Sequence, residues 1–301
     1  LSKIDTRVTF MNDGFLIVDK EPAMTSHDVV AMGRKALGTR KVGHAGTLDP
    51  MATGILVLGF GNGTRLLQYI TDGDKSYEAT IVLGASTVTD DHEGALITAK
   101  DASQVDDGSI KKILNAMVGR ISQRPSSVSA VKVGGERAYD RVRAGEVFEL
   151  APRTITISSL NILEIRHLNH TTEVDIDVTC SAGTFIRAIA RDLGDELGVG
   201  GHLRALRRTR VAGFALDVAT SITDLKAKTF HTLDLTDVAR RTFVARELSV
   251  EEVRELSFGR ALSPSATHEI TAAISAENIL IALLKNDGDK AKPVAVFAAA
   301  H

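Results

Sequence analysis

The sequence predicts an α+β protein that ends in a small β-rich domain. Short apolar runs typical of strands alternate with stretches whose apolar residues recur at helical spacing. The pattern weakens after about residue 224, and from residue 249 onward short apolar runs are separated by polar turns such as NDGD. With 301 residues, of which 44% are hydrophobic, the chain can bury one large core and a smaller one.

Both element types can be placed along the first two thirds of the chain. Thr25 and Ser26 are N-cap candidates for the first helix, and Gly38 is a candidate for its end. Strict alternation of apolar and polar residues marks residues 174–180 as a half-buried strand. We predict strands over residues 14–19, 55–60, 77–83 and 174–180, and helices over residues 25–38, 65–70, 110–119 and 185–197.

Residues 124–153 differ from the rest of the chain. They contain prolines, a Gly134-Gly135 turn and five arginines, with only short strand or helix patterns. Such a composition predicts a protruding, partly mobile insertion that closes on a ligand.

Composition excludes several classes of protein. No apolar run approaches the roughly 20 residues that a membrane span needs, and the N-terminus lacks a basic segment followed by an apolar stretch, so we expect a cytoplasmic protein. The lone Cys180 excludes an intrachain disulfide and is expected to be a small core residue. The nine histidines show no metal-ligand spacing.

The charge pattern is informative only locally. The formal net charge is -2, whereas nucleic-acid-binding proteins usually carry a basic domain or patch. Arg34, Lys35, Arg40 and Lys41 lie close together, and residues 202–210 read HLRALRRTR. Such clusters are either solvated faces or phosphate contacts, and composition does not decide between them.

Residues 43–54, which read GHAGTLDPMATG, form the strongest candidate for a functional loop. The Asp49-Pro50 pair alone indicates a turn or a helix N-cap. A functional interpretation needs a carboxylate on a loop of small residues that a substrate can approach closely, and this loop provides one. The glycine-rich residues 59–64 suggest a phosphate-binding enzyme instead, but they lack the lysine and the spacing of phosphate-binding loops, which favours a plain turn.

The loop resembles the signature of the TruB family of tRNA pseudouridine synthases, whose catalytic aspartate lies in a G-G-T-L-D-P-x-A-T-G-like loop. The resemblance covers most of the chain. It continues in VDK...MTSHDVV at 18–30, GTRLLQYI at 63–70, KSYEATIVLG at 75–84, TDDHEG at 89–94, RPSSVSAVKVGGERAY at 124–139, CSAGTFIRAIARDLG at 180–194 and HLRALRRTRVAGF at 202–214.

The resemblance implies three catalytic residues and neither a cofactor nor a metal. Asp49 matches the aspartate that attacks the target nucleotide, after which the uracil detaches, rotates and rejoins the ribose through carbon 5. Tyr77 matches an active-site tyrosine that can stack on the flipped base or help to remove the carbon 5 proton. Arg187 matches the arginine that pairs with the aspartate and keeps it ionised.

Further residues are implied as substrate contacts. His44 matches a histidine that accompanies extrusion of the base, and Lys20 matches a lysine of the first family motif, although this chain has DKEPAMTS where the family has D-K-P-x-G-x-T-S. Phe185 and Leu206 match residues near the flipped base, with core packing as the alternative for each.

Arg207 and Arg208, from the second basic cluster, are also predicted to contact the RNA. Their predicted partners are the phosphates of the backbone.

The family resemblance also implies the architecture and the partner. We expect a pseudouridine synthase fold with a central mixed or antiparallel sheet over residues 13–225, including the insertion at 124–153, and a linker with a small PUA-like domain over 226–301. Residues 1–12 are an unassigned leader. The implied substrate is the T-arm stem-loop of tRNA with uridine 55 as target, bound by a monomer without an obligatory protein partner. The alternative is a tRNA-folding chaperone that uses the same cleft.

Overall fold

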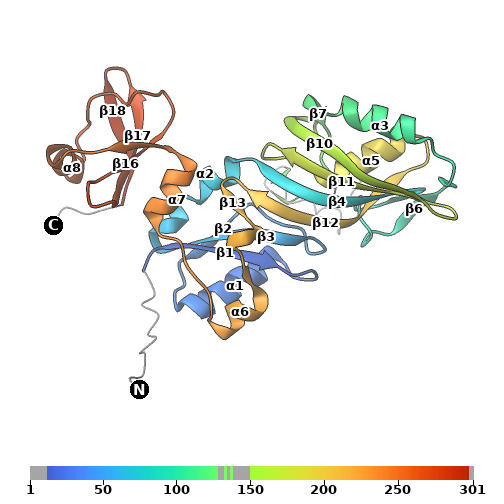
Figure 1. Cartoon of the computed structure of the whole chain (residues 1–301), viewed down its shortest axis with the longest axis horizontal. Coiled ribbons are helices and arrows are strands. Elements are labelled where there is room, and N and C mark those ends of the chain that lie inside the picture. The colour runs from blue at the N-terminus through green and yellow to red at the C-terminus, as the bar shows by residue number, and fades with distance from the viewer. Residues whose placement is uncertain (1–11, 128–131, 134–135, 138–149, 298–301) are drawn as a thin grey trace.

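The computed structural model describes residues 12–127, 132–133, 136–137 and 150–297 (Figure 1). Residues 1–11 of the predicted leader and most of the predicted insertion at 124–153 lie outside the described residues. Within the described part of the chain, no helix is both long and apolar enough to span a membrane.

A large mixed sheet organises the protein, as the sequence predicted. Among the described residues it contains ten strands, with the order β14-β1-β3-β12-β4-β11-β10-β7, while β2 and β13 pair with β3 and β12. The β1–β14 and β3–β12 pairs are parallel and the other pairs are antiparallel. The strands are β1 (Gly14–Lys20), β2 (Val42–Ala45), β3 (Thr53–Phe60), β4 (Lys75–Leu83), β7 (Gly119–Gln123), β10 (Arg153–His167), β11 (Thr172–Cys180), β12 (Gly201–Val211), β13 (Phe214–Ala215) and β14 (Thr220–Ser221).

Helices cover both faces of this sheet (Figure 1). Alternation along β1 sends Leu16 and Val18 to a core with helices α1 (Ser26–Leu37) and α6 (Ile222–Ala227), and sends Phe15 and Ile17 to the opposite face. Helices α3 (Asp107–Ala116) and α5 (Ile186–Glu196) cover the other half, over β4, β10, β11 and β12. The predicted caps of α1 are confirmed, because Thr25 forms a capping box and Gly38 is left-handed.

The C-terminal sheet shares a core with the large sheet. Phe15 and Ile17 of β1 lie in one apolar cluster with Val238 of α7 (Leu235–Thr242) and with Ile274 and Leu283 of the small sheet. The elements of this part are β15 (Val244–Glu247), α8 (Val250–Ser257), β16 (Thr271–Ile274), β17 (Leu280–Asp287) and β18 (Lys290–Val296), in the strand order β15-β16-β17-β18. The predicted β-rich C-terminal part is therefore confirmed, and it is packed against the rest of the chain.

Short elements complete the described structure. Cys180, at the end of β11, is buried as expected. Residues 59–64, considered above as a phosphate-binding loop, end β3 and enter a 3-10 turn whose Asn62 amide donates to Asp13. The remaining elements are β5 (Ala85–Thr87), β6 (Leu96–Ala99), β8 (Lys132–Val133), β9 (Glu136–Arg137), the 3-10 turns η1 (Gly61–Arg65) and η2 (Leu216–Val218), and helix α2 (Leu67–Asp72).

Gly54 permits the close approach of β3 and β12 behind the predicted functional loop. It pairs with Arg208 in the parallel register, and its φ of +101° favours glycine. A Cβ atom at this position would lie 2.2 Å from the carbonyl oxygen of Arg208. Because that oxygen belongs to the backbone of a central strand, it has no room to move aside.

We therefore expect Gly54→Ala to lower the free energy of unfolding by about 3 kcal/mol or more, through backbone strain and overpacking. Urea unfolding followed by circular dichroism measures the change. The control is Gly38→Ala, where φ is also positive at +67° but no atom lies within 4 Å of the added Cβ. Its expected cost is about 1 kcal/mol. Equal costs for the two variants would contradict the packing argument.

Candidate active site

Asp49 lies on the loop between β2 and β3 and is paired at two points with Arg187 of α5. Nε of Arg187 lies 3.0 Å from Oδ2 of Asp49, and Nη2 lies 3.2 Å from Oδ1. The Arg187 side chain is 6% exposed, whereas that of Asp49 is 34% exposed. The pair therefore presents an oriented carboxylate at the surface, with its cation buried behind it.

Arg187 is itself held by the segment that follows β5. Its Nη1 donates to the carbonyl of Thr89 at 2.7 Å and to Oδ2 of Asp91 at 3.3 Å. Asp91 is buried, and its other oxygen accepts from the amide of Glu93. The guanidinium thus bridges two carboxylates, which offsets the cost of burying its charge. This role of Asp91 was not predicted, because nothing in the sequence pairs it with a residue 96 positions away.

Two buried cations hold the loop that carries Asp49. Arg208 on β12 donates to the carbonyls of Ile55, Thr47 and Gly46. Lys20 at the end of β1 donates to the carbonyls of Pro50, Met24 and Glu21. Three of these carbonyls, those of Gly46, Thr47 and Pro50, belong to the loop itself, which has no strand partners for them.

A direct contact of Lys20 or Arg208 with the substrate stays a prediction, and in this structure both side chains bind carbonyls of the Asp49 loop. Lys20 is 0% exposed and Arg208 is 1% exposed, so neither side chain reaches the surface. Their charges are used inside the protein because the turn that carries Asp49 leaves carbonyl groups without strand partners. Arg207 differs from its neighbour: its side chain is 36% exposed and forms an ion pair with Asp19.

Tyr77 and Leu206 lie in the apolar cluster beneath the loop, together with Leu48 and Met51. Burial raises the pKa of the Tyr77 phenol, and the neighbouring Arg208 only partly offsets this effect. The phenol is therefore protonated at neutral pH and can donate a hydrogen bond. Leu206 is buried, as the core-packing alternative requires.

Phe185 and His44 lie at the edges of the site. Phe185 is the half-buried N-cap residue of α5, two positions before Arg187. His44 on β2 contacts His27 of α1 edge to face, with ring centroids 5.7 Å apart. Burial, followed by the proximity of His27, lowers the pKa of His44 and favours its neutral form.

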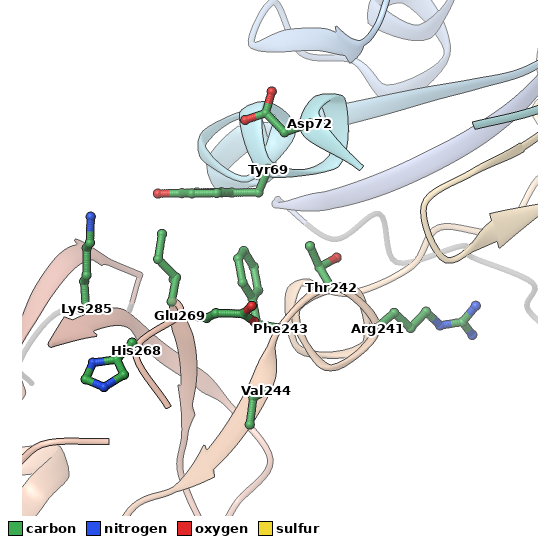
Figure 2. A pocket seen from close by; sticks show the side chains of 10 residues that line it. Tyr69, Asp72, Arg241, Thr242, Phe243, Val244, His268, Glu269 and Lys285 are labelled. Atoms are coloured by element: carbon green, nitrogen blue, oxygen red, sulfur yellow. The ribbon is translucent and has the colours of Figure 1, made fainter. Parts of the chain in front are cut away.

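A separate hollow lies at the junction with the C-terminal sheet (Figure 2). Tyr69 and Asp72 of α2 line it together with Phe243 and Lys285, and the rings of Tyr69 and Phe243 meet edge to face with centroids 5.2 Å apart. None of the predicted site residues lines this hollow.

Comparison with known proteins places the sequence in one family. The profile described as "TruB family pseudouridylate synthase (N terminal domain)" matches residues 34–186. The profiles "tRNA pseudouridylate synthase B C-terminal domain" and "tRNA Pseudouridine synthase II, C terminal" match residues 187–245 and 243–298. A protein of Arthrobacter sp. (strain FB24) called "tRNA pseudouridine synthase B" is 50% identical over 96% of this chain and 97% of its own length.

The chain belongs to the TruB family. A relative from Nocardia farcinica with the same name is 49% identical over 94% of this chain and 92% of its own. The structure in "Crystal Structure of a Cbf5-Nop10-Gar1 Complex" matches with a TM-score of 0.73 over 96% of this chain and 86% of that chain, at 24% identity. At this identity the likeness shows the pseudouridine synthase fold alone.

The free energy of unfolding of this TruB protein should depend on pH through Lys20, which holds the Asp49 loop. Burial lowers the pKa of Lys20 to about 8 from the ordinary 10.5. Between these values the unfolded chain holds the proton and the folded chain does not, so the contribution of Lys20 to the free energy of unfolding rises with pH.

We therefore expect the difference in free energy of unfolding between wild type and Lys20→Met to grow by about 3 kcal/mol from pH 8 to pH 10.5. Urea titrations at several pH values measure this difference. Burial also lowers the pKa of Lys75 to about 8, but its contribution cancels because both proteins contain it. The same substitution at the exposed Lys112 is the control. A difference that stays flat or shrinks with pH would contradict the assignment.

Proposed function

We propose that this protein isomerises uridine to pseudouridine at position 55 in the T-loop of tRNA. The observation that carries the proposal is the pair of Asp49 and Arg187, which holds a carboxylate at the surface on a loop of small residues. Membership of the TruB family and relatives called "tRNA pseudouridine synthase B" support the reaction class. The choice of uridine 55 follows from the family resemblance.

The reaction needs a nucleophile on a base that has left the RNA stack. Asp49 attacks the target nucleotide at the ribose or at the ring, and the bond between N1 of the uracil and the ribose breaks. The uracil rotates and C5 forms a bond to the ribose, the bond between Asp49 and the nucleotide breaks to restore the carboxylate, the C5 proton is lost, and N1 gains one. Before the attack, the ion pair with Arg187 holds the carboxylate of Asp49 directed outward.

The remaining site residues bind and orient the flipped base. In this proposal Tyr77, protonated at neutral pH, packs on the uracil and donates from its hydroxyl group. Phe185 and Leu206 form apolar walls, and the neutral His44 lies beside the space that the base leaves. A protonated phenol is a poor base, so this role favours stacking over removal of the C5 proton by Tyr77.

The cellular location, the oligomeric state and the domain division of the protein are also proposals. A tRNA substrate agrees with action in the cytoplasm by a monomer that needs no obligatory protein partner. The division into a catalytic domain over residues 13–225 and a PUA-like domain over 226–301 stays a prediction, as does a role of the insertion at 124–153 in closing on the RNA.

The first test is tritium release from tRNA that carries [5-³H]uridine. Wild type should release tritium, and Asp49→Asn should release none above background, because an amide cannot act as the nucleophile. Binding of tRNA, measured by filter retention, should persist in the variant. If wild type binds and refolds tRNA without releasing tritium, and Asp49→Asn does the same, the protein is a tRNA-folding chaperone.

A second test concerns the basic residues of β12. Because Arg207 is partly exposed, we expect Arg207→Ala to reduce the slope of log Kd against log salt for tRNA by about 1, the effect of one lost phosphate contact. Lys112→Ala removes the same charge from the exposed side of α3 and is the control. An unchanged slope for Arg207→Ala would remove this residue from the RNA contacts.

A further inference from the structure

The segment Thr89–Asp91 connects the active site with the base of the insertion. The Thr89 carbonyl and the Asp91 carboxylate both accept from Nη1 of Arg187. Asp90 lies between them with φ at +59°, a left-handed conformation that is uncommon for aspartate. Its backbone amide donates a hydrogen bond to the carbonyl of Thr87, and its carbonyl accepts one from the amide of Leu203.

The side chain of Asp90 binds a second arginine of helix α5. Oδ2 of Asp90 lies 3.2 Å from Nη1 of Arg191. Arg191 follows Arg187 by one helical turn, so both guanidinium groups project from the same face of α5. Both partners are mostly buried, with side-chain exposures of 12% for Asp90 and 16% for Arg191.

Arg191 also holds the first residue of the insertion. Nη2 of Arg191 donates to the carbonyl of Arg124 at 2.7 Å. Ser126, two residues further on, is fully buried, and burial of Asp90 raises the pKa of its carboxyl. Just before them, the Gln123 side chain exchanges two hydrogen bonds with the backbone of Phe185, at 3.0 and 2.9 Å.

These contacts lie on both sides of Arg187 along helix α5. Phe185, two positions before it, is bonded to Gln123, and Arg191, four positions after it, is bonded to Asp90 and Arg124. Buried ion pairs are poor sources of net stability, because desolvation offsets their attraction. Buried ion pairs do fix the positions of the groups that they join. Arg187 must contact the carboxylate of Asp49 at two points, so its position has to be fixed.

We propose that Asp90 and Arg191 are positioning residues, which fix the Arg187 guanidinium against Asp49 and fasten the base of the insertion to the active site. Neither touches the reacting atoms. Asp90 acts through its two neighbours, Thr89 and Asp91, and Arg191 acts through Asp90 and Arg124. This inference rests on the proposed function, since its readout is the rate of that reaction.

The test compares Asp90→Asn and Arg191→Met with wild type. Asparagine keeps the shape of aspartate and tolerates the left-handed backbone, so the first substitution removes little besides the charge. We expect the single-turnover rate of tritium release to fall about tenfold or more in each variant, with the Kd for tRNA within about twofold of wild type. The double variant should be no slower than the slower single variant, because the pair acts as a unit.

Asp175→Asn is the control, because it weakens a partly buried carboxylate–arginine pair with Arg166 on another part of the sheet. Its rate should match that of wild type. Wild-type rates in both pair variants, multiplicative losses in the double variant, or losses confined to tRNA affinity would overturn the inference. An absence of tritium release from wild type itself would instead overturn the proposed function.

Discussion

Burial of the Arg187 charge is the constraint on which the active site depends. A guanidinium removed from water must be neutralised and hydrogen-bonded, or it destabilises the fold. Here one carboxylate comes from the loop after β2, and the other comes from the segment after β5. The structure therefore requires the loop, the segment and helix α5 to meet at one point, and the exposed carboxylate of Asp49 is directed outward because its cation cannot move.

The hydrogen bonds of its backbone impose a second requirement on the same loop. The tight turn that carries Asp49 leaves carbonyls without strand partners, and Arg208 and Lys20 supply the missing donors from opposite sides. The hydroxyl group of Ser26 donates a hydrogen bond to the carbonyl of Leu48 and accepts one from its amide. A loop of small residues, which would otherwise be mobile, is thus held by side chains from β1, α1 and β12.

Local signals were enough to predict α1, since its caps and its apolar spacing agree. They were not enough for β10 and β12. Both strands contain bulges, at Ile157/Ser159 and Ile162/Glu164 in β10 and at Leu203/Ala205 and Arg208/Arg210 in β12, and each bulge breaks the period of two. The stretch at 202–210 was accordingly described only by its charge, although it is a central strand.

The site was predictable only through family resemblance. Asp49 and Arg187 are 138 positions apart, and no pattern in the chain joins them. The burial of Lys20 and Arg208 was not predicted, because lysine and arginine are almost never fully buried unless paired, and their partners here are backbone carbonyls that a sequence does not reveal. Asp90 and Asp91 are adjacent in the chain but bind different arginines, a distinction that depends on the left-handed turn at Asp90.

The shared core between β1 and the C-terminal sheet has a consequence for how the chain folds and changes. Phe15 and Ile17 are covered from the distant end of the sequence by α7, β16 and β17. Contacts of such large sequence separation form late, so the strand beside the active-site loop stays partly uncovered until the last residues of the chain have emerged. A substitution that opens a cavity in the small sheet therefore also loosens the packing of β1, the strand whose last residue, Lys20, holds the Asp49 loop.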